Sequence, residues 1–307
     1  MLSPIVLFAF NRPFHTYKTL KTLIKNEESR ESNLIVYLDG PKSHAQINQI
    51  NNVEKVILGF KENFKKININ KFEINLGLDH NIRKGITEIL KVNKNLIVLE
   101  DDINVSPYFL RYMNQALNLY EDNKKIWHIN GFNFPISRKE KQNSYFTRVM
   151  FCWGWATWQD RWQKFMNDPL YHDPFFIKEK FNRKLIHEFE LHSKTNFWWS
   201  QINKNINGKL NNWDIFWYSY IFLNNGLCLT PTTSLTRNIG HDGSGIHCDT
   251  NNEIQNSFLS NTSINYFPEQ IIEDEVNLIL MKNYLKKTYN FRAKVFRKIM
   301  NLLSRYF

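Results

Sequence analysis

Short apolar runs alternate with segments of helical periodicity along the first third of the chain. Ile5 to Phe10, Leu34 to Leu38 and Leu96 to Leu99 read as buried strands, whereas Asp79 to Val92 repeats its apolar residues at the spacing of an amphipathic helix. Strands that alternate with helices are typical of βαβ units. The pattern therefore predicts an α/β fold with a mostly parallel central sheet flanked by helices.

The composition changes near Phe151, where the sequence becomes rich in Trp and in helical patterns, yet no Gly/Ser-rich linker precedes it. We therefore expect one domain made of a βαβ half at 1–130 and a second half at 131–265. The Gly- and Asn-rich segment from Thr236 to Asn265 lacks periodicity and predicts a long loop that acts as a lid. Residues 266–307 predict a basic, amphipathic, helical C-terminal extension.

The net charge of +11 is concentrated at the C-terminus, because eight basic residues and no acidic one follow Glu275. A nucleic-acid-binding protein usually spreads its basic residues over the folded surface, so we predict no nucleic-acid partner. Phe291 to Phe307 places apolar residues on one helix face and basic residues on the other. Two interpretations stay open: the helix lies on an anionic membrane surface, or it packs on the body of the protein.

The apolar run at the N-terminus ends at Asn11-Arg12-Pro13, which indicates a buried strand rather than a signal peptide or a membrane anchor. The three cysteines, Cys152, Cys228 and Cys248, are far apart and form no C-x-x-C pair, which argues against a disulfide framework. We expect a cytoplasmic protein that can be peripheral on the inner face of the cell membrane.

The triplet Glu100-Asp101-Asp102 directly follows a buried strand and is the first candidate for chemistry. Carboxylates at the carboxyl end of a strand are well placed to hold a hard divalent cation, Mn²⁺ or Mg²⁺, against the phosphates of a nucleotide. The alternative is an acidic run that favours the start of a helix in which Ser106 is the cap and Pro107 the first helical residue.

A second candidate is Asp214, which precedes an aromatic run and is either a helix N-cap or a base in an apolar wall. Three Trp residues, Trp153, Trp155 and Trp158, lie within six positions. With Trp213, they suggest a wall on which a sugar ring stacks, and dense packing is the alternative.

The third candidate is the glycine-rich stretch from Gly240 to Cys248. Its glycines allow the backbone to approach a phosphate, and its histidines can bind a phosphate or a metal. A zinc site made of His241, His247 and Cys248 matches no common spacing, so a lid is the favoured interpretation.

Together, these segments resemble the N-acetylglucosaminyltransferase I family, inverting enzymes of the GT-A fold, in order from Ile5 to Cys248. The segment "VLEDDINVSPYFLRYM" is very similar to the family signature E-D-D-[LI]-x-x-[AS]-P-x-[FY]. "IVLFAFNRP" and "IVYLDG" look like the family's first two strands, "CWGWATW" like its G-x-G-W stretch, "NWDIFWYSY" like its W-D-D-W stretch, and "NIGHDGSGIH" like its lid.

The resemblance implies a role for each matching position. Asp102 is then the direct Mn²⁺ ligand and Asp214 the catalytic base. The remaining positions fall into two groups: Arg12, Asp39, Glu100 and Asp101 on the nucleotide sugar, and Gly240, His241, Gly243 and His247 in the lid. Ile215 stands where the family has a second acid, which leaves the acceptor site in doubt.

The implied activity is a metal-dependent, inverting sugar transfer from a nucleotide-diphosphate sugar, with UDP-N-acetylglucosamine as the family default. The acceptor is then a glycan or a lipid-linked saccharide of surface polysaccharide synthesis. Two alternatives remain: a carbohydrate-binding protein that uses its Trp cluster, and a sugar nucleotidyltransferase. The second would need a glycine-rich phosphate loop after the first strand, and "AFNRPFH" contains no Gly.

Overall fold

A computed structural model of the chain describes residues 2–136, 143–240 and 259–290. The strands are β1 (Ile5–Ala9), β2 (Asn33–Leu38), β3 (Lys66–Lys71), β4 (Asn95–Glu100), β5 (Ile103–Val105), β6 (Ile126–Asn130), β7 (Ser144–Thr147), β8 (Trp155–Trp158), β9 (Leu227–Pro231) and β10 (Thr236–Asn238). The helices are α1 (Pro13–Leu23), α2 (Ile47–Leu58), α3 (Leu78–Leu90), α4 (Phe109–Leu119), α5 (Gln159–Met166), α6 (Pro174–Lys180), α7 (Arg183–Phe189), α8 (Trp199–Ile206), α9 (Asp214–Leu223) and α10 (Glu275–Tyr289).

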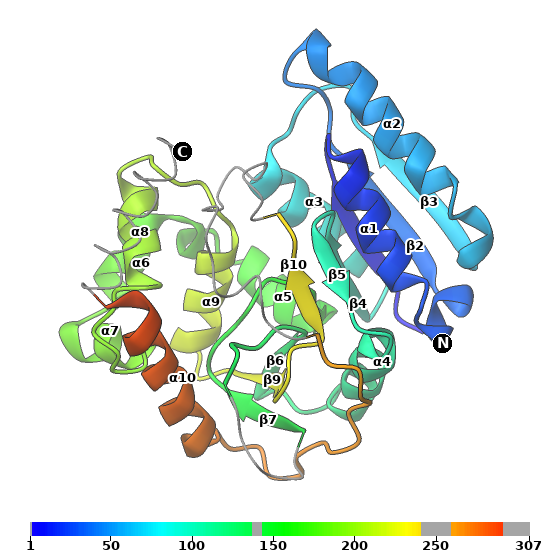
Figure 1. Cartoon of the computed structure of the whole chain (residues 1–307). Coiled ribbons are helices and arrows are strands. Elements are labelled where there is room, and N and C mark those ends of the chain that lie inside the picture. Colours follow the sequence, from blue (N-terminus) through cyan, green and yellow to red (C-terminus); the bar gives the residue numbers. More distant parts are fainter. Residues whose placement is uncertain (1, 137–142, 241–258, 291–307) are drawn as a thin grey trace, which may run out of the picture.

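The described residues form a central sheet of eight strands in the order β3-β2-β1-β4-β8-β6-β9-β7 (Figure 1). Strands β3, β2, β1 and β4 run parallel, and β6 runs parallel to β9. Strand β8 is antiparallel to both of its neighbours, and β7 is antiparallel to β9. The predicted α/β class with a mostly parallel sheet flanked by helices is confirmed.

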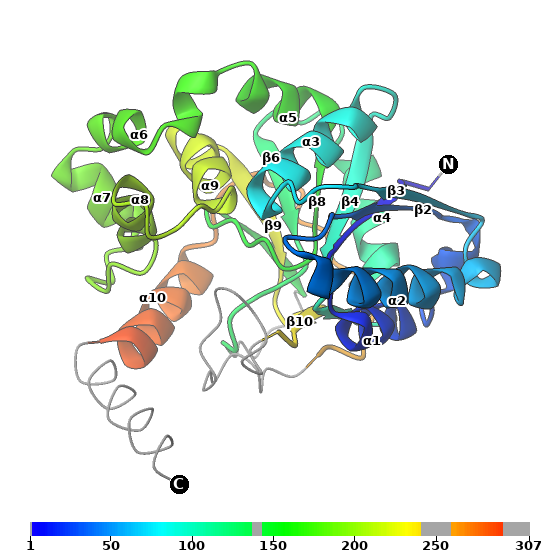
Figure 2. The same cartoon turned by 90° about the horizontal axis from the view of Figure 1, so that it is seen from above.

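Two hydrophobic cores lie on the two faces of the sheet. Successive residues of β1 alternate between them, as a strand covered on both faces requires: Leu7 packs with α1, α2 and α4, and Val6 packs with α3, α5 and α9. Figure 2 shows α3 and α5 on one side of the sheet and α1 and α2 on the other. The sheet is thus the rigid layer from which the site residues project.

The second half of the chain continues the same sheet. Strand β8 lies between β4 and β6, so it joins the halves on either side of residue 130. The sequence indicated little strand in this region, because the Trp residues of β8 suggested an exposed wall. They are instead fully buried, with Trp155 in one core and Trp158 in the other.

Two other expectations need adjustment. Helix α4 begins at Phe109 rather than at Pro107, because the Ser106 hydroxyl accepts a bond from the Tyr108 amide in a turn that precedes the helix. In the region expected to be loop, Thr236–Asn238 forms β10, which pairs antiparallel with β5. The expected amphipathic helix at 291–307 lies outside the described residues. In the described part of the chain, no helix is both long enough and apolar enough to cross a bilayer.

Candidate active site

The parallel arrangement brings Arg12 and the acidic triplet to one edge of the sheet. Arg12 follows β1 and the triplet begins at the last residue of β4, and these strands are neighbours. The Arg12 guanidinium is paired with Asp101 and, at 2.9 Å, with Asp102. Both carboxylates are buried, and the Phe10 amide also donates to Asp101 at 3.4 Å. The ion pairs fix the position of Asp102 just beyond the carboxyl end of β4.

The segment after β10 covers this edge through Gly240. The Ile239 amide donates to the Asp102 carbonyl at 2.8 Å, and the Asn238 side chain accepts from the Gly240 amide at 2.7 Å. A Cβ at Gly240 would lie 2.3 Å from Asp102 Oδ2 and 3.1 Å from Arg12 Nη1. Only glycine therefore fits here without a shift of the candidate metal ligand.

Asp214, the first residue of α9, reaches the same edge from the second half of the chain. Its Oδ1 accepts from Asn212 Nδ2 at 2.5 Å, and its Oδ2 lies 3.7 Å from Cys152 Sγ. Asn212 is held in turn by Gln201, 2.9 Å away, and by Asn205, 2.7 Å away. An amide and a thiol thus fix both oxygens of the carboxylate.

The carboxylates influence one another. Burial raises the pKa of Glu100 well above its ordinary value, and the negative charges of Asp102, Asp101 and Asp214 raise it further. Burial also raises the pKa of Asp101 to about 6, although the charge of Arg12 acts in the opposite direction. Asp214 has a pKa raised by burial, against the hydrogen bond from Asn212. The acids of β4 and α9 therefore lie within electrostatic reach of each other.

The chemistry of this edge fits a hard divalent cation. Asp101 and Asp102 pair with Arg12, and both of them and Asp214 lie within electrostatic reach of Glu100. Carboxylate oxygens are the ligands that Mg²⁺ and Mn²⁺ prefer. In the described part of the chain, no group of three or more His, Cys, Asp or Glu side chains is arranged to hold a metal alone. A cation bound by one or two carboxylates plus substrate phosphates needs no such cage. Asp102 is the side chain that would hold it.

Asp39 has a different environment from the one expected of a nucleotide ligand. Its Oδ1 accepts from the Gly40 and Leu76 amides, and its Oδ2 accepts from Asn75 Nδ2 and the Gly77 amide. Four bonds fill the acceptor capacity of a carboxylate. Asp39 thus holds the loop that leads into α3, and the expected uracil contact stays a prediction.

The Trp residues are divided between core and surface. Trp155 is fully buried, with its ring stacked on Trp213 at 5.2 Å and on His128 at 4.8 Å. Trp213 is also buried, so the interpretation of these two rings as a sugar-stacking wall is wrong. Trp153 is half-buried, and its carbonyl accepts from Thr236 Oγ1 at 2.6 Å, which places it beside β10. Its role as a sugar contact stays a prediction.

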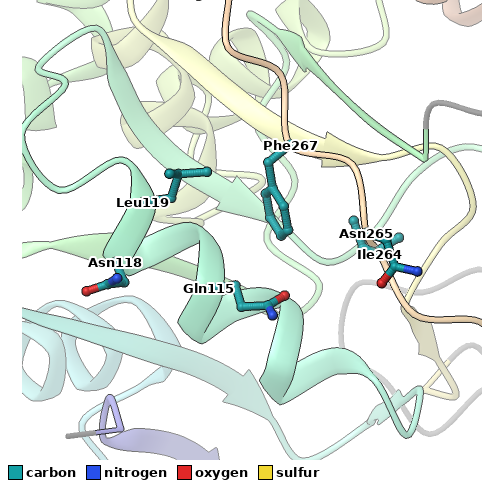
Figure 3. Close-up of a pocket in the computed structure, with 6 residues that line it drawn as sticks. All are labelled: Gln115, Asn118, Leu119, Ile264, Asn265 and Phe267. Carbon is teal, nitrogen blue, oxygen red and sulfur yellow. The ribbon is translucent and has the colours of Figure 1, made fainter.

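Three of the four expected lid residues, His241, Gly243 and His247, lie outside the described residues, and Gly240 alone is placed at the site. A shallow hollow of about 410 Å³ lies elsewhere, between the second half of α4 and the segment 264–267 (Figure 3). Its lining contains Gln115, Asn118 and Phe267 and none of the expected site residues. This hollow is therefore separate from the acidic edge.

Sequence reasoning missed two residues of the site, Cys152 and Asn212. Burial raises the pKa of the Cys152 thiol, as do the charges of Asp214 and Glu100. The thiol therefore stays protonated, and its S–H group donates a hydrogen bond to Asp214. A lone cysteine 62 residues before Asp214 gives no sequence signal for this contact. Asn212, two residues before Asp214, was the more accessible clue, because Asn commonly bonds to groups two positions away.

No protein family and no curated protein matches the chain. It is similar in part to many solved structures, among them the three that follow. With Staphylococcus aureus TarS, the identity is 10% and the TM-score 0.39, over 55% of this chain and 29% of that one. With the galactosyltransferase LgtC in complex with donor and acceptor sugar analogs, the identity is 11% and the TM-score 0.35, over 71% of this chain and 70% of that one. With UDP-glucose pyrophosphorylase complexed with UDP-glucose, the identity is 12% and the TM-score 0.31, over 54% of this chain and 80% of that one.

The chain thus spans less than a third of the length of TarS. The low identities and TM-scores mean that only part of each structure resembles this chain. The finer resemblance to the N-acetylglucosaminyltransferase I family remains a prediction.

Proposed function

We propose that the chain is a metal-dependent glycosyltransferase that moves a sugar from a nucleotide diphosphate to an acceptor hydroxyl with inversion. One observation carries this proposal: Asp214 of α9 lies within electrostatic reach of Glu100 on β4, although 114 positions separate them (214 − 100). A carboxylate suited to accept a proton thus lies beside carboxylates suited to hold a cation. Transfer from a nucleotide sugar needs both functions.

The donor side is made of Arg12, Asp102 and Gly240. Asp102 would hold a divalent cation, which would supply positive charge to neutralise the departing diphosphate. Arg12 orients Asp102 through its ion pair and adds a positive charge near the phosphates. Gly240 lets the backbone close over Asp102, which helps to exclude water, a competing nucleophile.

Asp214 is the proposed base. As the acceptor oxygen attacks the anomeric carbon, its proton passes to the Asp214 carboxylate, the new C–O bond forms, and the bond to the diphosphate breaks on the opposite face. Burial raises the pKa of Asp214, which makes its ionised form a stronger base than an exposed aspartate. Asn212 and Cys152 act on its orientation, since each contacts one carboxylate oxygen.

Substrate identity rests on the sequence resemblance alone. UDP-N-acetylglucosamine is the first donor to test, and a glycan or lipid-linked saccharide of surface polysaccharide synthesis is the proposed acceptor. Because Asp39 is already saturated by loop amides, its proposed part in donor binding is indirect. It shapes the loop after β3 rather than contacting the base.

Thermal shift against UDP-, GDP-, CMP- and dTDP-sugars, with and without Mn²⁺, tests this function. We expect one nucleotide sugar to raise the Tm in the presence of Mn²⁺, and we expect Asp102→Ala to abolish that rise. Asp122→Ala, which removes an exposed carboxylate, is the matched control and should respond like the wild type. If no donor raises the Tm, or if Asp102→Ala still responds fully, the donor site is elsewhere and a carbohydrate-binding role becomes the better account.

A further inference from the structure

The exposed face of α1 combines aromatic rings with lysines. Phe14, Tyr17, Lys18 and Lys21 follow the i, i+3, i+4, i+7 spacing of one helix face, and Lys25 continues it just beyond the helix. Phe14 is 61% exposed and Tyr17 42% exposed, with Lys18 and Lys21 respectively over their rings. We call this set the α1 ridge.

The α1 ridge carries a net positive charge. No acidic residue occurs within α1, and the nearest glutamates after it, Glu27 and Glu28, are paired with Arg111. Rings at an exposed helix surface beside lysines are the composition of segments that lie at a membrane interface. There the rings enter the headgroup region and the lysines contact anionic headgroups.

Helix α10 presents a second surface of this kind. Val276 and Ile279 are exposed along one face of the helix, and Lys286 and Lys287 are exposed further along it. Ile272 is exposed just before the helix begins. On the opposite face, Met281 and Leu285 are buried in the core, so the helix is fixed on the body with this stripe outward. We call these five exposed residues the α10 stripe. The sequence beyond it adds Arg292, Lys294, Arg297, Lys298 and Arg305 and no acidic residue.

Helices α1 and α10 lie on one side of the molecule. Figure 2 shows α1 and α10 along the same side, and it shows α3 and α5 along the opposite side. Because Arg12 immediately precedes α1, this side also borders the acidic edge. A flat partner could therefore touch the α1 ridge and the α10 stripe together and lie next to the site.

We propose that the α1 ridge and the α10 stripe bind the surface of an anionic phospholipid membrane. Aliphatic and aromatic side chains enter the interface, and the lysines pair with anionic headgroups. Nucleic acid fits less well, because exposed isoleucine and valine gain nothing from a phosphate backbone. The proposal does not depend on the sugar-transfer chemistry, since vesicle binding needs no donor.

Co-sedimentation of the full chain with vesicles tests this proposal. One set of vesicles is phosphatidylcholine alone, and the other contains added phosphatidylglycerol. The wild type should bind only the second set, and salt should weaken the binding. Lys18→Gln with Lys21→Gln should lower the partition coefficient roughly 30-fold, since each lysine near an anionic surface contributes a factor of about 5 to the affinity. Val276→Ser with Ile279→Ser should also lower it.

The matched controls lie at the end of α3, on the other side of the sheet. Lys91→Gln with Lys94→Gln makes the same charge change as the α1 variant, and Val92→Ser removes an 83% exposed side chain. Both controls should bind like the wild type, and circular dichroism should show equal Tm values for all variants. Equal weakening by the α1 variant and its lysine control would overturn the proposal. The proposal would also be overturned if phosphatidylglycerol did not increase the binding of the wild type to vesicles. The same holds if the wild type formed a dimer that buries these surfaces and bound no vesicles.

Discussion

At the scale of single residues, the site depends on how closely Gly240 approaches Asp102. The backbone leaves no space for a methyl group, because a Cβ at Gly240 would lie 2.3 Å from the carboxylate oxygen. Arg12 Nη1 would be 3.1 Å from that methyl group, so neither ion-pair partner can move without disturbing the other. A small change at residue 240 should therefore act on the cation site rather than on the fold.

Gly240→Ala should reduce Mn²⁺-dependent stabilisation by the nucleotide sugar at least about tenfold in apparent affinity, since crowding of this size costs about 1–3 kcal/mol. Gly208→Ala is the control, because Gly208 has a φ of +65° and a Cβ added there would meet no heavy atom within 4 Å. It should lower the Tm through backbone strain and leave donor binding unchanged. Equal donor responses in the two variants would show that Gly240 has no special place at the site.

The sequence was enough to predict that the residues at the strand ends lie at one edge of the sheet, but it was not enough to predict their hydrogen-bond partners. The positions of Arg12, Asp101 and Asp102 followed from the rule that parallel strands end at one edge. The bonds of Asp39 to the loop at 75–77 were not predictable, because they depend on the path of a loop with no periodicity. The same holds for the contact of Cys152 with Asp214.

At the scale of elements, a neutral histidine joins β6 to α9. His128 Nδ1 accepts from Trp217 Nε1 at 3.2 Å, and its Nε2 donates to the Phe151 carbonyl at 3.0 Å. The ring is fully buried, and burial lowers its pKa to about 3. Protonation would remove the acceptor that Trp217 needs, so the packing of α9, which carries Asp214, requires the neutral ring.

The stability of the wild type should therefore fall in acid for a reason that can be assigned to His128. Between pH 6.5 and about 3, the unfolded chain binds a proton that the folded protein excludes. Because of this residue, the free energy of unfolding should fall by about 1.4 kcal/mol per pH unit as the pH falls through that range. Urea unfolding of the wild type and His128→Gln at pH 7, 6, 5 and 4 measures the effect. The stability difference between them should shrink toward low pH, and a constant difference would refute this assignment.

Strands β1, β2 and β4 were predictable because they are continuous apolar runs, whereas β8 was not. Its sequence, Trp-Ala-Thr-Trp, has large rings at alternate faces only because both faces of the sheet are covered. The same rings suggest stacking on sugars when the covering helices are unknown. Tertiary packing, and not local pattern, thus decided between a wall and a core.

At the scale of the whole molecule, the described segment at 273–289 is part of the body. Glu273 accepts from the Arg148 backbone amide at 2.7 Å and pairs with the Arg148 guanidinium, and the Asp274 amide donates to the Phe146 carbonyl at 2.9 Å. Met281 of α10 is fully buried against the core that contains α9. The basic, helical extension predicted from the sequence is therefore anchored at least as far as α10.

Met281→Ala should destabilise the entire protein by about 2–5 kcal/mol, because it leaves a cavity in a shared core. Val276→Ala, on the exposed face of the same helix, should change the stability by less than about 0.5 kcal/mol. Denaturant titration followed by Trp fluorescence compares the two. If Met281→Ala left the main transition unchanged, α10 would be an appendage that folds separately.

The central claim is that Asp214 is the base of a sugar transfer, and comparison of the wild type with Asp214→Asn tests it most directly. Once a donor is known, release of nucleoside diphosphate is measured with saccharide acceptors, and donor affinity is measured by thermal shift on the same samples. Asn keeps the size of the side chain and removes its basicity, so turnover should fall by about 10²–10⁴ while donor affinity stays the same. Turnover close to that of the wild type, or loss of donor binding together with turnover, would contradict the account.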